Sequence, residues 1–190
     1  IKKGFKQVGK DFPVFLHPNT NEEYALARKD RKTGVGHKDF QFNFSPNVTL
    51  EEDLERRDLT INSMALDENG NLIDPFNGAK DIENKCFRPV SQAFFEDPLR
   101  ALRVARFKAQ FPEFFLHESM EQALFKISAS NELLNLSSER VWGEVVKGLE
   151  HDFHQFLQIV RNYNLHDPWF NKLSEIPDLS LIHISEPTRP

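Results

Sequence analysis

The stretch that decides the fold of this chain is Glu96-Asp-Pro-Leu-Arg100-Ala-Leu-Arg103-Val-Ala-Arg106-Phe107. Asp97 is a good N-cap acceptor and a proline follows it, so the stretch predicts the start of a helix. On a helix of 3.6 residues per turn its three arginines form one stripe, and Leu99 and Phe107 project within the same arc. Guanidinium groups among apolar neighbours need acceptor partners, because an unpaired buried charge is too costly. Those partners are protein carboxylates or the phosphates of a ligand, and spacing alone slightly favours the carboxylates.

The chain beyond residue 91 continues the helical pattern. Apolar residues recur there at helical spacing, which predicts an all-helical region. The predicted core positions are Leu99, Leu102, Ala105, Met120, Leu124, Ile127, Val141, Val145, Leu149, Phe153, Leu157 and Val160. Ser137 or Ser138 is expected to cap one of these helices.

The chain before residue 91 has the signals of short strands and turns. Residues 12–17 and 23–28 are β-prone runs around a turn, which indicates a hairpin. Residues 29–38 are charged and contain two glycines, which predicts a mobile loop. Thr49 and Glu52 form a capping box that opens a short helix. Asn69-Gly70 indicates a second hairpin between residues 59–66 and 72–76, with a turn at residues 74–78.

These signals predict the α+β class, with a small mixed β-sheet followed by helices. We place one unit over residues 1–91 and a second over residues 92–178. Residues 179–190 do not follow the pattern; we interpret them as a translated sequencing-library adapter.

Composition narrows the possible functions. The 190 residues carry a net charge of −5, so any nucleic-acid contact must come from local basic patches. The single cysteine, Cys86, fits a reducing compartment, and we expect a cytoplasmic protein. No apolar run approaches the roughly 20 residues of a membrane span. His151 and His154 lie one helical turn apart, but ordinary packing explains them better than a metal site does.

Three motifs occur together in one order: Arg56-Arg-Asp-Leu-Thr-Ile-Asn62, then Asp74-Pro-Phe-Asn-Gly78, then the stretch from Glu96 to Phe107. This ordered set resembles the class II bacterial tRNA nucleotidyltransferases, the CCA-adding enzymes, over about residues 7–163. The resemblance implies a truncated nucleotidyltransferase head followed by a helical neck. It also implies that Glu139-Arg140-Val-Trp142 braces the helical region.

The resemblance assigns a role to eight residues, which together would bind the incoming nucleotide. Asp97 and Arg100 would template the base, and Glu96 would orient that pair. Phosphate binding would come from Arg57, Arg103 and Arg106, and ribose reading from Asp58 and Asn62.

The chemistry of the bases supports a carboxylate paired with a guanidinium. Cytosine and adenine both present an amino donor beside a ring-nitrogen acceptor, which matches a carboxylate beside a guanidinium. Uracil and guanine present the reverse order and would be rejected. The resemblance therefore implies CTP and ATP as substrates and tRNA as the partner.

Phosphoryl transfer in this family needs Mg²⁺, held by an Asp-x-Asp pair behind a Gly-Gly-x-x-Arg-Asp turn. Neither motif occurs in this sequence, so we predict no catalytic residue and no metal ligand within it. Glu23 is a candidate supporting carboxylate near the metals, although a surface charge is the more frequent role. The loop at residues 29–38 falls where the family has a flexible element that switches from CTP to ATP.

Two other functions stay open at this point. Bacterial poly(A) polymerases share the arginine-arginine-aspartate and glutamate-aspartate motifs. A noncatalytic module that binds nucleotide or RNA would also keep them.

Overall fold

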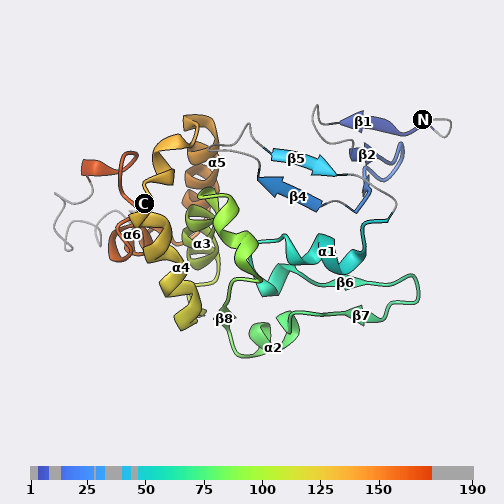
Figure 1. Ribbon diagram of the computed structural model, residues 1–190, viewed down its shortest axis with the longest axis horizontal. Coiled ribbons are helices and arrows are strands. Elements are labelled where there is room, and N and C mark those ends of the chain that lie inside the picture. Colours follow the sequence, from blue (N-terminus) through green and yellow to red (C-terminus); the bar gives the residue numbers. More distant parts are fainter. Residues whose placement is uncertain (1–3, 9–13, 28, 33–39, 44–46, 173–190) are drawn as a thin grey trace, which may run out of the picture.

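The computed structural model describes residues 4–8, 14–27, 29–32, 40–43 and 47–172. Most of the strands lie at one end of the molecule, and the four helices between residues 99 and 162 lie at the other (Figure 1). This arrangement confirms the predicted α+β class. Within the described residues no helix is both long and apolar enough to cross a membrane.

The N-terminal sheet has three antiparallel strands in sequential order, β1 (Lys6–Val8), β2 (Val14–Leu16) and β3 (Glu23–Ala25). The β2–β3 pair confirms the first predicted hairpin, with shorter strands than expected. Next, β4 (Lys29–Lys32) pairs antiparallel with β5 (Phe40–Asn43). The predicted loop is therefore wrong over residues 29–32, and residues 33–38 lie outside the described residues. Main-chain pairing forms this strand, whose four charged or polar residues show no apolar alternation.

The segment that leads to the first motif is built from local hydrogen bonds. Both bonds of the predicted capping box are present, between Thr49 and Glu52, and α1 (Leu50–Glu55) follows. The second hairpin is confirmed, with β6 (Ala65–Leu66) antiparallel to β7 (Leu72–Ile73). Its first strand is shorter than predicted, because the chain first makes the 3₁₀ turn η1 (Thr60–Asn62).

The second motif supports that 3₁₀ turn. The Asp74 carboxylate accepts the amides of Gly78 and Ala79 at 2.7 and 2.9 Å, which starts α2 (Gly78–Glu83). A Cβ at Gly78 would lie 2.2 Å from the carbonyl oxygen of Thr60, so the helix can pack here only with glycine. From α2, the buried Asp81 accepts the Thr60 hydroxyl at 2.7 Å. Packing at Gly78 and the hydrogen bond from Thr60 to Asp81 thus hold η1 against α2.

The rest of the chain is mainly helical, as predicted. Its elements are β8 (Cys86–Phe87), η2 (Gln92–Glu96), α3 (Leu99–Gln110), β9 (Phe115–Leu116), α4 (Glu118–Ala129), η3 (Glu132–Asn135), α5 (Ser138–Leu149) and α6 (Phe153–Asn162). Helix α3 packs against both α5 and α6. Ser137 occupies the N-cap position of α5, as expected, but its side chain makes no capping bond.

Most predicted core positions are buried in one cluster. Leu149 is an exception: it is 53% exposed, because it lies on the outer side of the last turn of α5. Phe153 is half-buried against the cluster. Leu59 and Phe87 join the same core from before residue 91, and β8 pairs with β9 across it. The unit boundary near residue 91 stays a prediction.

Candidate functional site

A cavity of about 530 Å³ opens between the end of α1 and the start of α3. Its lining consists of Arg56, Arg57, Asp58, Asn62, Asp97, Leu99, Arg100, Arg103 and Arg140. Arginines outnumber aspartates by five to two in this lining. The planar, permanently charged guanidinium suits phosphate groups, so the cavity fits a polyanion. Six of the eight predicted site residues line it, and Glu96 and Arg106 lie outside the lining.

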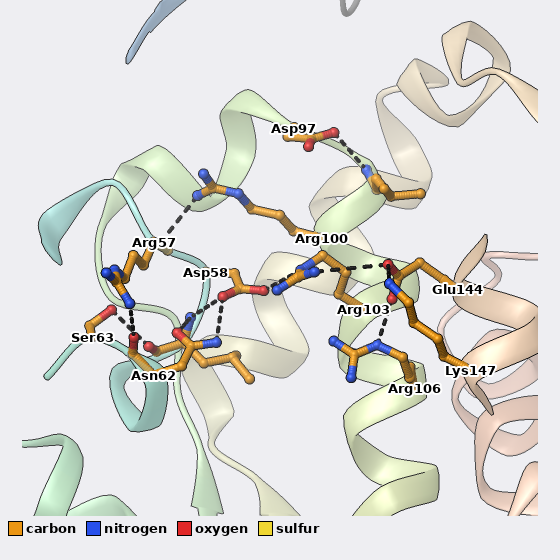
Figure 2. A network of polar contacts seen from close by, with 12 residues as sticks. Arg57, Asp58, Asn62, Ser63, Asp97, Arg100, Arg103, Arg106, Glu144 and Lys147 are labelled. Atoms are coloured by element: carbon orange, nitrogen blue, oxygen red, sulfur yellow. Dashed lines mark hydrogen bonds and ion pairs between the residues drawn. The ribbon is translucent and has the colours of Figure 1, made fainter. Parts of the chain in front are cut away.

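Asp58 lines this pocket and is buried. Its carboxylate accepts the Nε–H of Arg103 at 2.6 Å and the side-chain amide of Asn62 at 2.7 Å (Figure 2). Burial alone would raise the pKa of Asp58, but the Arg103 guanidinium and these hydrogen bonds hold that pKa below its ordinary value. Asp58 is therefore an anion that orients Arg103 and Asn62.

Arg100 crosses from α3 to the end of α1. Its Nη1 donates to the carbonyls of Ala93 and Arg57 at 2.7 and 3.2 Å, and its Nη2 donates to the carbonyl of Arg56. Burial lowers the pKa of Arg100, while the nearby carboxylates of Asp58 and Asp97 act in the opposite direction. The guanidinium thus ties the neck helix α3 to the segment that carries the first motif.

Asp97 has two partners in the structure. One carboxylate oxygen accepts the backbone N–H of Leu99 at 3.1 Å, but Pro98 and not Asp97 occupies the N-cap position. The helix itself begins at Leu99, one residue later than expected. The other oxygen accepts from Arg140 of α5 at 2.6 Å. Both groups of the predicted base template therefore face one pocket, each held by a different partner.

Arg106 bonds Glu144 of α5 and lies outside the pocket lining (Figure 2). Its Nε donates to Glu144 at 2.6 Å, its guanidinium lies 4.0 Å from the centre of the Phe107 ring, and its side chain is 12% exposed. The same carboxylate lies 3.8 Å from Arg103 and 3.7 Å from Lys147. The arginine stripe thus has both kinds of surroundings that the sequence allowed: Arg100 and Arg103 face the pocket, while a protein carboxylate holds Arg106.

The sequence did not assign Arg56, Leu99 or Arg140 to the site. Arg56 stands next to Arg57 in the first motif, and Arg140 belongs to the motif interpreted as a brace. Both arginines belong to motifs that the sequence shows, but their place in the pocket depends on how α1 and α5 pack against α3.

The described residues contain no group of three or more His, Cys, Asp and Glu side chains that could hold a metal ion. The pocket carboxylates Asp58 and Asp97 are bonded to arginines, so these residues do not fit a Mg²⁺ site by themselves. His154 shares a hydrogen bond of 2.8 Å with Gln158, which fits packing. Glu23 lies exposed in the edge strand β3, and its proposed role near the metals stays a prediction.

Comparison with known proteins places this fold in one class. The family model of the poly A polymerase head domain matches residues 5–88. The chain is also similar to the "CCA-adding enzyme in complex with CTP" of Bacillus stearothermophilus, with 31% identity and a TM-score of 0.64 over 82% of this chain and 37% of that one. A second similar structure is a "tRNA nucleotidyltransferase complexed with a primer tRNA and an incoming ATP analog". Its identity is 29% and its TM-score 0.66, over 87% of this chain and 47% of that one. The fold thus matches that of a nucleotidyltransferase head followed by a helical neck.

The particular family follows from sequence identity. The "Multifunctional CCA protein" of Pseudoalteromonas atlantica is 53% identical over 176 residues, which are 91% of this chain and 44% of the relative. Over these residues the chain matches the CCA-adding enzymes, the tRNA nucleotidyltransferases of the class II bacterial type, in sequence and in fold. It spans less than half the length of the relatives that it matches.

Proposed function

We propose that this chain is the nucleotide-selecting part of a cytoplasmic enzyme that adds CCA to the 3′ end of tRNA, or repairs that end, from CTP and ATP. The observation that carries the proposal is the arginine-lined pocket in which Asp97 and Arg100 both reach the wall. The similar structures named for CTP, for primer tRNA and for an ATP analog support it.

Base selection follows from the donors and acceptors left in that pocket. Arg100 uses three of its five N–H groups on backbone carbonyls, which leaves donors for the ring nitrogen of a base. A carboxylate oxygen has two lone pairs, so Asp97 can accept from an amino group while it keeps Arg140. Cytosine and adenine satisfy both groups, whereas uracil and guanine oppose both.

The remaining pocket residues suit the rest of a nucleotide. Arg57, Arg103 and the newly found Arg56 supply guanidinium groups for a triphosphate. Asp58 and Asn62 offer an acceptor and an amide to ribose hydroxyls. Arg106 and Glu96 act from outside the lining, Arg106 by holding Glu144 beside Arg103. Mg²⁺ and its ligands would come from a part of the protein outside these residues.

Nucleotide titration of the chain tests base selection. We expect the wild-type chain to bind CTP and ATP more tightly than UTP and GTP. Asp97→Ala should remove most of that preference, because the acceptor for the amino group is gone. An unchanged preference in this variant would show that Asp97 does not read the base.

Transfer is tested in a longer protein that carries this segment. We expect that protein to extend tRNA lacking CCA with CTP and ATP, and to leave a poly(A) primer with ATP alone unextended. The opposite result would identify a poly(A) polymerase. No transfer to either primer would identify a noncatalytic binding module.

A further inference from the structure

A buried carboxylate lies behind two arginines of the pocket wall. Asp53 of α1 is 7% exposed and is not part of the lining. One of its oxygens accepts from Nε and Nη2 of Arg56 at 3.0 and 2.7 Å. The other lies 3.5 Å from Nη2 of Arg57. A single side chain therefore contacts both neighbouring arginines, one through each oxygen.

We infer that Asp53 is a positioning residue of the nucleotide pocket, which fixes Arg56 and Arg57 at its wall; this inference rests on the proposed function. A free arginine side chain has rotamer entropy, which it loses when it binds a ligand. Asp53 imposes part of that order before binding. Arg57 is further held because its Nη1 donates to the carbonyl of Asn62 at 2.9 Å. Arg57 keeps further N–H groups for a phosphate.

The charge of Asp53 acts against its positioning effect. A carboxylate this close to the pocket repels the phosphates of a nucleotide, so its charge alone weakens binding. Removing the charge would therefore strengthen binding if Asp53 did nothing else. Removing a positioning contact would weaken binding instead. The two roles therefore predict changes of opposite sign in nucleotide affinity for the same substitution at Asp53.

The test compares Asp53→Asn with Glu55→Gln by titrating the chain with CTP, ATP and inorganic tripolyphosphate at low and high salt. Glu55 is exposed on the same helix, so its variant makes the same charge change without a pocket contact. We expect Asp53→Asn to weaken binding of all three ligands about tenfold, the cost of one charge-assisted contact. Preference for CTP and ATP over UTP and GTP should stay. Glu55→Gln should bind as the wild type does, or slightly more tightly at low salt.

A second pair of variants separates positioning from general damage. In an Arg56→Met, Arg57→Met background the Asp53→Asn substitution should weaken binding little further, because its effect passes through those arginines. A full additional loss there would overturn the inference, as would unchanged or tighter binding by Asp53→Asn alone. Titration stoichiometry should stay constant, whereas unfolding would lower it. If Asp53→Asn does not fold, Asp53→Glu keeps the charge with shifted geometry, and wild-type affinity in that variant would overturn the inference.

The wild-type titration separates a failure of the proposed function from a failure of the positioning role of Asp53. A wild-type chain that binds none of the nucleotides refutes the proposed function and this inference together. A wild-type chain that selects CTP and ATP, with Asp53 variants of equal affinity, refutes only the positioning role.

Discussion

Glu144 offers the strongest test of how the arginine stripe is held. This carboxylate is 4% exposed on α5 and bonds Arg106 at 2.6 Å, with Arg103 and Lys147 within 4 Å. Glu144→Gln keeps the volume and one acceptor but removes the charge. Arg106, which is 12% exposed, then loses its ion pair inside the protein. Breaking a buried pair from one side costs about 3–5 kcal/mol. Because Arg103 keeps Asp58 and Lys147 is exposed, we expect the lower end, about 3 kcal/mol.

Urea denaturation at pH 7, followed by circular dichroism, measures this loss. A matched control is Glu150→Gln, since Glu150 ends the same helix and is exposed. It should change the free energy of unfolding by less than about 0.5 kcal/mol. In the double variant Glu144→Gln, Arg106→Gln the loss should be smaller than the sum of the two single losses, because neither buried group is then an unpaired charge. A loss under about 1 kcal/mol for Glu144→Gln, or strict additivity, would refute the buried network.

Two further predictions concern the support of the pocket. Gly78→Ala should destabilise the chain by about 2 kcal/mol or more in the same denaturation assay, because its Cβ would collide with the Thr60 carbonyl. The control Gly143→Ala has open space around it, so it should be neutral or stabilise α5 by up to about 1 kcal/mol. Equal effects of the two substitutions would contradict the close packing at Gly78. Asp58 has a lowered pKa in the folded chain, so its contribution to stability is complete above the unfolded pKa of about 3.9 and is lost as pH falls through the lower folded pKa. Unfolding measured from pH 2 to 6 should therefore show a smaller loss of stability on acidification for Asp58→Asn than for the wild type, and parallel curves would show that Asp58 is not held as an anion.

Structural features that depend on residues close together in the chain were predicted correctly. The Thr49–Glu52 capping box and the Asn69-Gly70 hairpin both depend on hydrogen bonds between residues close together in the chain. Helical spacing likewise found the buried faces of α3 and α4.

Errors arose where a distant segment decided the structure. β4 exists because of its main-chain pairing with β5, although the charged sequence of residues 29–32 has no strand pattern. Leu149 has apolar neighbours at helical spacing, yet it is 53% exposed, because the last turn of α5 packs against Phe156 through Gly148 instead. Periodicity identifies the apolar side of a helix, but the packed neighbour determines which residues of that side are covered.

The amino-acid sequence by itself determined the set of residues available to the site and the helical phase that puts Arg100, Arg103 and Arg106 along one side of α3. It also carried the ordered motifs that identify the family. Only the tertiary structure decided the partner of each charge. Asp58, Arg140 and Glu144 lie 38 to 45 residues from the groups that they bond in α3 or just before it. Their pairing depends on how α1 and α5 pack against α3, because helical phase is a local property of the chain and a long-range ion pair is not.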